Sequence, residues 1–179
     1  MKYSVFFCLL FLSYYSPAAT VVPVTLDQDY NLVKEVDYLL DTTDALPLKE
    51  VMQSSNWQGI KRRLISFGLY NGAVWLRFKV RAQEDGIWVL NTPYSQLDLV
   101  QSTAIINGQM GKTITTGDLF EFSSRPLNHP GFVFPFTLSK GDLLEVYLKV
   151  KSEGSVEVPL NFLSLVSFDK SESIRNFLM

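Results

Sequence analysis

The chain has 179 residues, of which 47% are hydrophobic, 13% aromatic and 19% charged. A disordered chain would have fewer apolar residues and a larger net charge, so this composition indicates one globular domain with ample material for a core. The formal net charge of −2 argues against a nucleic-acid partner, because binding to a phosphate backbone requires a dense surface of Lys and Arg.

Residues 1–19 have the pattern of a secretory signal peptide. Lys2 precedes an unbroken apolar run, Val5–Leu12, which is much shorter than the roughly 20 residues that span a bilayer. Pro17–Ala19 then provides small residues for cleavage. We therefore expect the mature chain to begin near Thr20 and to be exported to the periplasm of a Gram-negative bacterium. A buried N-terminal strand or helix is the alternative.

One segment, 44–53, has helical periodicity. Asp44 stands where it could cap the helix, Pro47 falls in the first turn, and Val51 belongs to an apolar face. The C-terminal stretch 168–179 is expected to form either a short polar helix or a frayed tail.

The rest of the chain has the pattern of short antiparallel strands. From residue 71 onward, glycine-containing turn signals recur at Asn71-Gly72, Asp85-Gly86, Asn107-Gly108, Gly117-Asp118, Pro130-Gly131, Gly141-Asp142 and Gly154-Ser155. Apolar residues alternate along four of the intervening stretches, which are Val74–Val80, Phe132–Leu138, Val146–Val150 and Val156–Phe162. This pattern predicts an all-β sandwich or barrel with one short N-terminal helix. Pro135 and Pro159 lack a backbone N–H, so their strands should be edges or bulged there.

Several motifs, taken in order, resemble a known receptor domain. They are the lead-in 39–52, Trp57, Phe67-Gly68, Val74–Phe78, Trp88, Leu97-Asp98, Gly117-Asp118, Ser124–Pro126, Phe132–Pro135, Tyr147–Val150 and Pro159-Leu160. Together they resemble the second type of extracellular domain of bacterial seven-transmembrane receptors with diverse intracellular signalling modules, the 7TMR-DISM family. The resemblance covers roughly Asp27 to Asp169.

The resemblance implies a periplasmic jelly-roll β-sandwich that is similar to carbohydrate-binding modules and senses an extracellular ligand. In that family the domain precedes seven membrane helices and then a histidine kinase or a diguanylate cyclase. We accordingly expect a sensor domain over 20–169 and a C-terminal tail over 170–179 that could begin a membrane-proximal linker. Because the sequence stops at Met179, the alternatives are a free-standing module, a partner of a separately encoded receptor, or the remnant of a truncated gene.

Catalytic chemistry is poorly represented in the sequence. His129 is the single histidine, and Cys8, the single cysteine, leaves with the signal peptide. The mature domain therefore has no disulfide and lacks the usual thiol and multi-histidine metal sites. No nucleophile elbow, phosphate-binding glycine loop or zinc-protease motif is present. We expect a protein that is not an enzyme and uses no cofactor or metal, although structural calcium remains an open alternative.

The expected binding surface is the row that points away from the core on the first clear strand. If Val74, Leu76 and Phe78 face inward, Trp75 and Arg77 share the opposite face. An indole beside a guanidinium suits a sugar ring with hydroxyl or carboxylate groups. The neighbouring row has a similar composition and contributes Tyr147, Lys149 and Lys151. The alternative is that Trp75 closes a second apolar layer while Arg77 pairs with an acid.

A second candidate is the turn-rich run 123–130, in which Arg125 and His129 could bind an anion or a sugar. The alternative is that Arg125 anchors the loop by donating to backbone carbonyls, since prolines deprive some of them of strand partners. Trp57 and Trp88 are expected in the core. The Lys61-Arg62-Arg63 triplet is expected to be solvated, with a weak contact to acidic headgroups as the alternative.

These observations favour a non-catalytic ligand-sensing domain that recognises a carbohydrate or a small anionic metabolite. The alternative function is a protein-interaction or dimerisation module that docks on a separate membrane receptor. The expected ligand-contacting residues are Trp75, Arg77, Arg125, His129, Tyr147 and Lys149.

Overall fold

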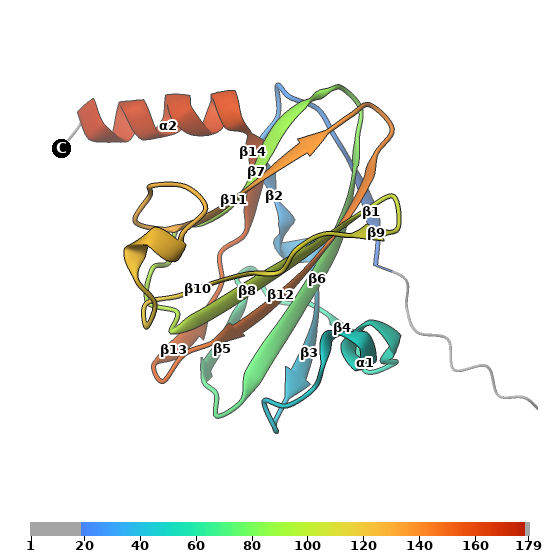
Figure 1. The fold of residues 1–179 in the computed structure, drawn as a ribbon, viewed down its shortest axis with the longest axis vertical. Coiled ribbons are helices and arrows are strands. Elements are labelled where there is room, and N and C mark those ends of the chain that lie inside the picture. Colours follow the sequence, from blue (N-terminus) through green and yellow to red (C-terminus); the bar gives the residue numbers. More distant parts are fainter. Residues whose placement is uncertain (1–18, 178–179) are drawn as a thin grey trace, which may run out of the picture.

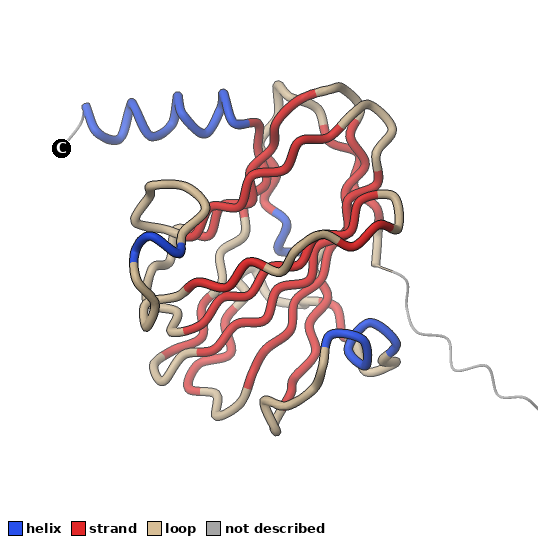
Figure 2. Tube along the Cα trace, in the orientation of Figure 1, coloured by secondary structure: helices blue, strands red, loops and turns tan. Residues whose placement is uncertain are grey.

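Two β-sheets pack against each other in the computed structural model, which describes residues 19–177 (Figures 1 and 2). Apart from Ala19, the predicted signal peptide lies outside the described residues. In chain order the elements are β1 (Val21–Val24), β2 (Tyr30–Asn31), the 3-10 turn η1 (Leu32–Lys34), β3 (Asp37–Asp41), α1 (Leu48–Gln53), β4 (Gln58–Gly59), β5 (Ser66–Leu69), β6 (Ala73–Ala82), β7 (Gly86–Thr92), β8 (Leu99–Ile106), β9 (Gln109–Met110), β10 (Ile114–Thr116), the 3-10 turn η2 (Phe122–Ser124), β11 (Phe132–Leu138), β12 (Leu143–Lys151), β13 (Ser155–Glu157), β14 (Asn161–Ser164) and α2 (Leu165–Phe177).

The larger sheet has eight strands in the order β10-β8-β12-β6-β3-β4, with β1 paired to β6 and β9 paired to β8. The smaller sheet has four strands in the order β11-β7-β14-β2, and β13 and β5 form a separate pair. Among the described residues, every strand pair is antiparallel except β1 with β6. The predicted class, a mostly antiparallel sandwich, is therefore confirmed.

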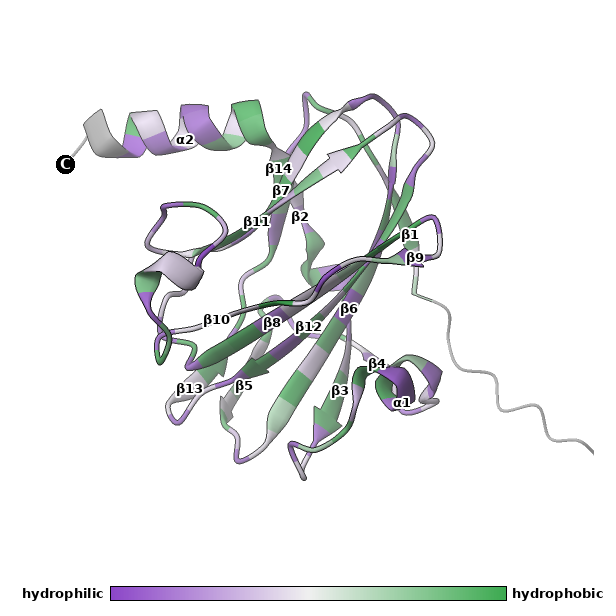
Figure 3. Cartoon of the chain, in the orientation of Figure 1, coloured by the Kyte–Doolittle hydropathy of each residue, from purple (hydrophilic) through white to green (hydrophobic). Residues whose placement is uncertain are grey.

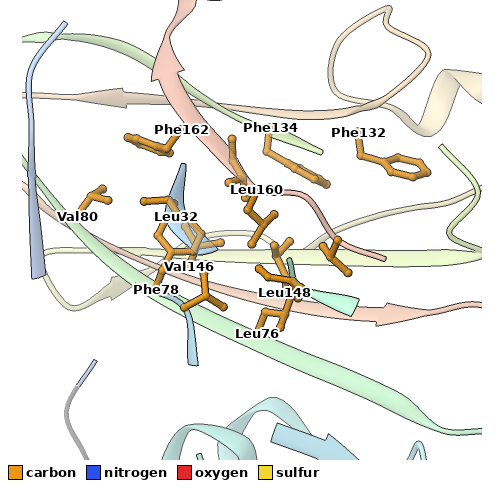
Figure 4. Close-up of a cluster of buried hydrophobic side chains, with 14 of the residues drawn as sticks. Leu32, Leu76, Phe78, Val80, Phe132, Phe134, Val146, Leu148, Leu160 and Phe162 are labelled. Carbon is orange, nitrogen blue, oxygen red and sulfur yellow. The ribbon is translucent and has the colours of Figure 1, made fainter. Parts of the chain in front are cut away.

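The inward faces of the two sheets meet in one apolar core. Figure 4 shows Leu76 and Phe78 of β6 pointing toward Phe134 and Phe162 of the smaller sheet. The rings of Phe78 and Phe162 meet edge to face with their centroids 6.0 Å apart. The alternating apolar residues of all four predicted strand stretches are buried, and they supply most of this core. Trp88 is also in the core, as predicted. Hydrophobic residues recur along the strands, whereas α2 is largely hydrophilic (Figure 3).

The two prolines within the predicted strands have different places in the sheets. Pro135 is in β11, the edge strand of the smaller sheet. Pro159 separates β13, which pairs with β5, from β14, which pairs with β7 and β2. Because proline has no N–H to donate, the chain leaves one ladder and joins another at this residue. Pro135 therefore lies in an edge strand, as predicted, whereas Pro159 lies between two strands and in neither an edge nor a bulged strand.

The N-terminal helix is shorter than predicted and is not capped by Asp44. Helix α1 begins at Leu48, with Pro47 at the N-cap and no side-chain cap hydrogen bond. Asp44 instead has a left-handed backbone with φ of 58°, and its carboxylate pairs with Lys149 and Lys151 on β12. Asp44 therefore pairs with two lysines and does not cap the helix, contrary to the prediction.

The C-terminal stretch forms a helix, α2, which runs through the expected boundary between residues 169 and 170. Its Phe168 packs on the outer face of the smaller sheet against Val89, Val133 and Leu163. The rest of α2 extends beyond the sheet (Figure 1). No helix in the described part of the chain is long and apolar enough to cross a membrane.

Gly117 allows two loops at one end of the sandwich to approach closely. It has a φ of 151°, and a Cβ atom at this position would lie 2.0 Å from the carbonyl oxygen of Asp98. We predict that Gly117→Ala lowers the free energy of unfolding by more than about 1 kcal/mol, because backbone must move to relieve the clash. Urea unfolding measures the loss. The matched control is Gly154→Ala, whose added methyl would lie 3.5 Å from its nearest neighbour and should change little. Equal losses in the two variants would contradict this account.

Candidate functional site

The outer face of the larger sheet carries a second, covered apolar cluster. The segment 42–57, here called the strap, includes α1 and lies over β3 and β6 on this face (Figure 1). The cluster beneath and within it consists of Leu39, Val51, Trp57, Trp75, Ile105 and Tyr147. Only 5% of Trp75, 7% of Arg77 and 4% of Tyr147 is exposed. The expectation that this row faces an accessible surface is therefore wrong, because the strap covers it.

Arg77 forms a partly buried ion pair with Asp37. Its Nε and one terminal nitrogen donate to Oδ2 of Asp37 at 3.0 and 2.9 Å. The guanidinium carbon also lies 4.4 Å from the ring centroid of Trp57. Burial raises the pKa of the neighbouring Tyr147 hydroxyl, and the charge of Glu145 adds to this effect while Arg77 opposes it. The alternative in which Arg77 pairs with an acid matches these contacts.

Lys149 and Lys151 both bind the carboxylate of Asp44 in the strap. The Nζ atom of Lys149 lies 2.8 Å from Oδ1 of Asp44 and donates to the carbonyl oxygen of the same residue at 2.9 Å. Lys151 pairs with Oδ2 of Asp44. Partial burial raises the pKa of Asp44, but the hydrogen bonds and charges of the two lysines outweigh burial and hold that pKa below its ordinary value. Lys149 also lies 5.6 Å from the ring centroid of Trp75.

Arg125 and His129 occupy a different part of the molecule, the loop that precedes β11. Arg125 donates to the carbonyl oxygens of His129 at 3.0 Å and of Pro130, as the loop-anchoring alternative anticipated. The ring of His129 is buried, with Nδ1 accepting a hydrogen bond from the Gly131 N–H at 2.9 Å. Its Nε2 lies 3.1 Å from a carboxylate oxygen of Glu172 in α2. These two residues thus hold the loop and α2 together.

The structure therefore divides the six predicted residues between two places. Four of them, Trp75, Arg77, Tyr147 and Lys149, gather beneath the strap, and the other two belong to the loop that contacts α2. The shared strand face of the first four was visible in the sequence. The cover over them was not, because the segment that supplies it ends at residue 57, which is 18 residues before Trp75 and 90 residues before Tyr147.

An open cleft lies at the edge of the larger sheet beside β4, and we call it the edge cleft. It has a volume of about 640 Å³ and is lined by Tyr38, Leu40, Gln58, Gly59, Ile60, Lys61, Arg62, Leu64, Ser66 and Phe67. The rings of Tyr38 and Phe67 contact each other with their centroids 5.1 Å apart. The Tyr38 hydroxyl donates to Oε1 of Gln58 at 2.8 Å. Aromatic surface and side-chain polar groups therefore stand side by side.

Two cations of the edge cleft are available to a ligand. Within the described residues, neither Lys61 nor Arg62 forms an ion pair with an acid. Both were expected to be merely solvated. The sequence signal was the basic triplet itself, but its aromatic partners Tyr38 and Phe67 reach the same cleft only through the fold. The combination of free positive charge and aromatic rings suits an anionic ligand that contains a ring.

A second cleft, at the end of the sandwich, has the opposite charge. It has a volume of about 690 Å³, and its lining includes Leu119, Phe120, Asp98, Glu153 and Lys151. Lys151 is already paired with Asp44, so the charge left over in this end cleft is acidic. It is therefore less suited to an anion than the edge cleft. Within residues 19–177 there is no group of three or more His, Cys, Asp or Glu side chains that could hold a metal ion.

Arg77→Ala leaves the carboxylate of Asp37, whose side chain is 17% exposed, without its partner. Breaking this partly buried, hydrogen-bonded pair should lower the free energy of unfolding by about 2 kcal/mol. The control is Arg81→Ala on the same face of β6, where the exposed side chain donates to the Gly141 carbonyl oxygen at 2.8 Å. Arg81→Ala should lower the free energy of unfolding by only about 0.5 kcal/mol. Superimposable urea curves for wild type and Arg77→Ala would refute the structural role.

The ion pairs of Asp44 with Lys149 and Lys151 make the stability of the folded protein depend on pH. Because the folded protein holds the pKa of Asp44 below its ordinary 3.8, the stabilisation is complete above that pH and is lost as pH falls through the folded-state pKa. Asp44→Asn lacks this contribution, so its Tm should lie below that of wild type near pH 7, and the gap should close as the pH falls below 3.8. Thermal unfolding across that range measures the gap. A gap that is constant with pH would contradict the ion-pair account.

Comparison with known proteins identifies the family. A family model described as 7TMR-DISM extracellular 2 matches residues 33–164. No curated protein matches the chain.

Similar solved structures include two of a beta-glucosidase from Kluyveromyces marxianus. The one in complex with glucose has 13% identity and a TM-score of 0.42, and the match covers 79% of this chain and 17% of the glucosidase. The selenomethionine-labelled form has 16% identity and a TM-score of 0.41, with the same coverage of 79% and 17%. This chain thus spans only a small part of the glucosidase. A native family 35 carbohydrate binding module from Clostridium thermocellum has 12% identity and a TM-score of 0.35, and the match covers 76% of this chain and 97% of the module.

The family model covers most of the described chain, in agreement with the resemblance carried by the strand and turn motifs. The chain belongs to the 7TMR-DISM extracellular 2 family and is an extracellular sensor domain, the part of such a membrane receptor that lies outside the cytoplasm.

Proposed function

We propose that this chain is a periplasmic, non-catalytic jelly-roll domain of a bacterial signalling receptor and that its edge cleft binds an anionic carbohydrate or a similar ring-containing anionic metabolite. The observation that supports this most strongly is the juxtaposition of Lys61 and Arg62, both without acidic partners, with the contacting rings of Tyr38 and Phe67. Family membership supports sensing as the role, and the cleft supports the chemistry of the ligand.

The edge cleft has the size and lining that a small ligand requires. Its volume of about 640 Å³ falls within the usual range for small-molecule sites, about 300–1,000 Å³. A sugar ring can place its C–H face on an aromatic ring while its carboxylate or phosphate meets Arg62. Gln58 and Ser66 add side-chain groups that can hydrogen bond to hydroxyls. Leu64, which is 68% exposed, provides apolar surface that a bound ligand would cover.

Arg62→Glu tests the cleft, with D-glucuronate and D-galacturonate as anionic probes and D-glucose and D-galactose as matched neutral probes. Isothermal titration calorimetry should show binding of at least one acid in preference to its neutral match. The charge reversal should weaken that binding by at least roughly tenfold, because it replaces attraction by repulsion.

Arg63→Glu is the matched control, since Arg63 is adjacent in sequence but does not line the cleft. It should retain binding and the wild-type Tm. Equal losses in both variants, or equal binding of the neutral sugars, would overturn the edge-cleft assignment. Absence of binding to either acid would favour the alternative, a domain that docks on another protein.

A further inference from the structure

The outer face of the larger sheet contains a preformed site for a carboxylate. Lys149 and Lys151 are two positions apart in β12, so their side chains leave the strand on the same face. Their ammonium groups converge on the two oxygens of one carboxylate, that of Asp44, and Lys149 is 2.8 Å from Oδ1. Among the described residues, neither lysine forms an ion pair with any other acid. Two positive charges thus share one negative partner.

An unused hydrogen-bond donor accompanies these cations. Trp75 lies directly opposite Lys149 in the β6–β12 ladder, and the ammonium is 5.6 Å from its ring centroid. Only 5% of Trp75 is exposed, and its Nε1 atom is buried without a hydrogen-bond partner. A buried N–H without an acceptor is unfavourable, so a ligand whose oxygen reached Nε1 would gain by accepting from it. The side chain of Asp44 does not supply that acceptor.

We propose that the Lys149–Lys151 pair beside Trp75 is a second anion site, separate from the edge cleft, and that the protein's own Asp44 carboxylate occupies it in place of a small carboxylate ligand. A carboxylate that displaces Asp44 also removes the contact between the strap and β12. Anion binding is thereby coupled to the segment that covers Trp75. This site does not depend on the edge-cleft proposal.

The strap has other attachments that would keep it in place when the Asp44 carboxylate is displaced. Asp41 accepts hydrogen bonds from the backbone N–H groups of Thr43 and Leu46 at 3.1 and 3.0 Å. Val51 is completely buried, and the indole N–H of Trp57 donates to its carbonyl oxygen at 3.0 Å. Asp44 itself lies at the surface, where 34% of its side chain is exposed, as is 37% of that of Lys151. A small ligand can therefore reach Lys151 from solvent, and Lys149, whose side chain is 12% exposed, becomes accessible when the Asp44 carboxylate leaves.

Chemical rescue of Asp44→Gly by acetate tests this site directly. Glycine tolerates the φ of 58° at this position, so the substitution removes the carboxylate with little backbone strain. Sodium acetate should raise the Tm of this variant saturably toward the wild-type value at neutral pH, while sodium chloride of equal ionic strength should raise it much less. Calorimetry with acetate should show one site in Asp44→Gly and much weaker binding in wild type, where acetate must first displace the Asp44 carboxylate.

Two further variants separate a specific site from a general salt effect. Asp44→Asn fills the same space with an amide, so acetate should not rescue it. Adding Lys149→Met to Asp44→Gly should weaken acetate binding by at least roughly tenfold, because one of the two cations is lost. Recovery of folded Asp44→Gly only in acetate would also support the site. Equal effects of acetate and chloride, retention of acetate binding after Lys149→Met, or failure to fold in either salt would overturn it.

Discussion

Strand β6 is buried on both of its faces, and this double burial constrains the rest of the structure. Leu76 and Phe78 point inward to the smaller sheet, while Trp75 and Arg77 point outward beneath the strap. An eight-stranded sheet with a bare outer face would expose these large side chains, so the strap acts as a third, partial layer. Because the strap covers Trp75 and Tyr147 on that face, the two clefts considered for recognition lie at the edge and at the end of the sandwich.

Charge pairing distinguishes structural cations from cations that are available to a ligand. Arg77 pairs with Asp37, Lys79 with Glu145, and Lys149 with Asp44, so each of these cations already has an acid within 2.9 Å. Lys61 and Arg62 have no such partner in the described chain, and they face an open cleft. An unpaired charge at an aromatic cleft retains its full attraction for a ligand, whereas a paired charge must first give up its partner. The edge cleft and the Asp44 site differ in this respect.

The sequence predicted the inward half of the sandwich well, because burial on one face produces a local alternation that can be counted along each strand. The alternating apolar residues of β6, β11 and β12 are all in the core, and Pro135 lies in an edge strand as predicted. The same alternation could not report what covers the other face. It therefore placed Trp75 on an open surface, and it also missed the parallel pairing of β1 with β6, which joins segments about 60 residues apart.

Local periodicity and motif order by themselves determined the β class, the inward faces and the family, since each depends on neighbouring residues or on the succession of short patterns. Only the tertiary structure decided which polar side chains are free, which are paired and which are covered. Asp44 and Lys149 are about 105 residues apart in the sequence. Tyr38 of β3 contacts Phe67 of β5, although α1 and β4 lie between these two strands in the chain. The electrostatic state and exposure of a side chain depend on such distant partners, and no local pattern encodes them.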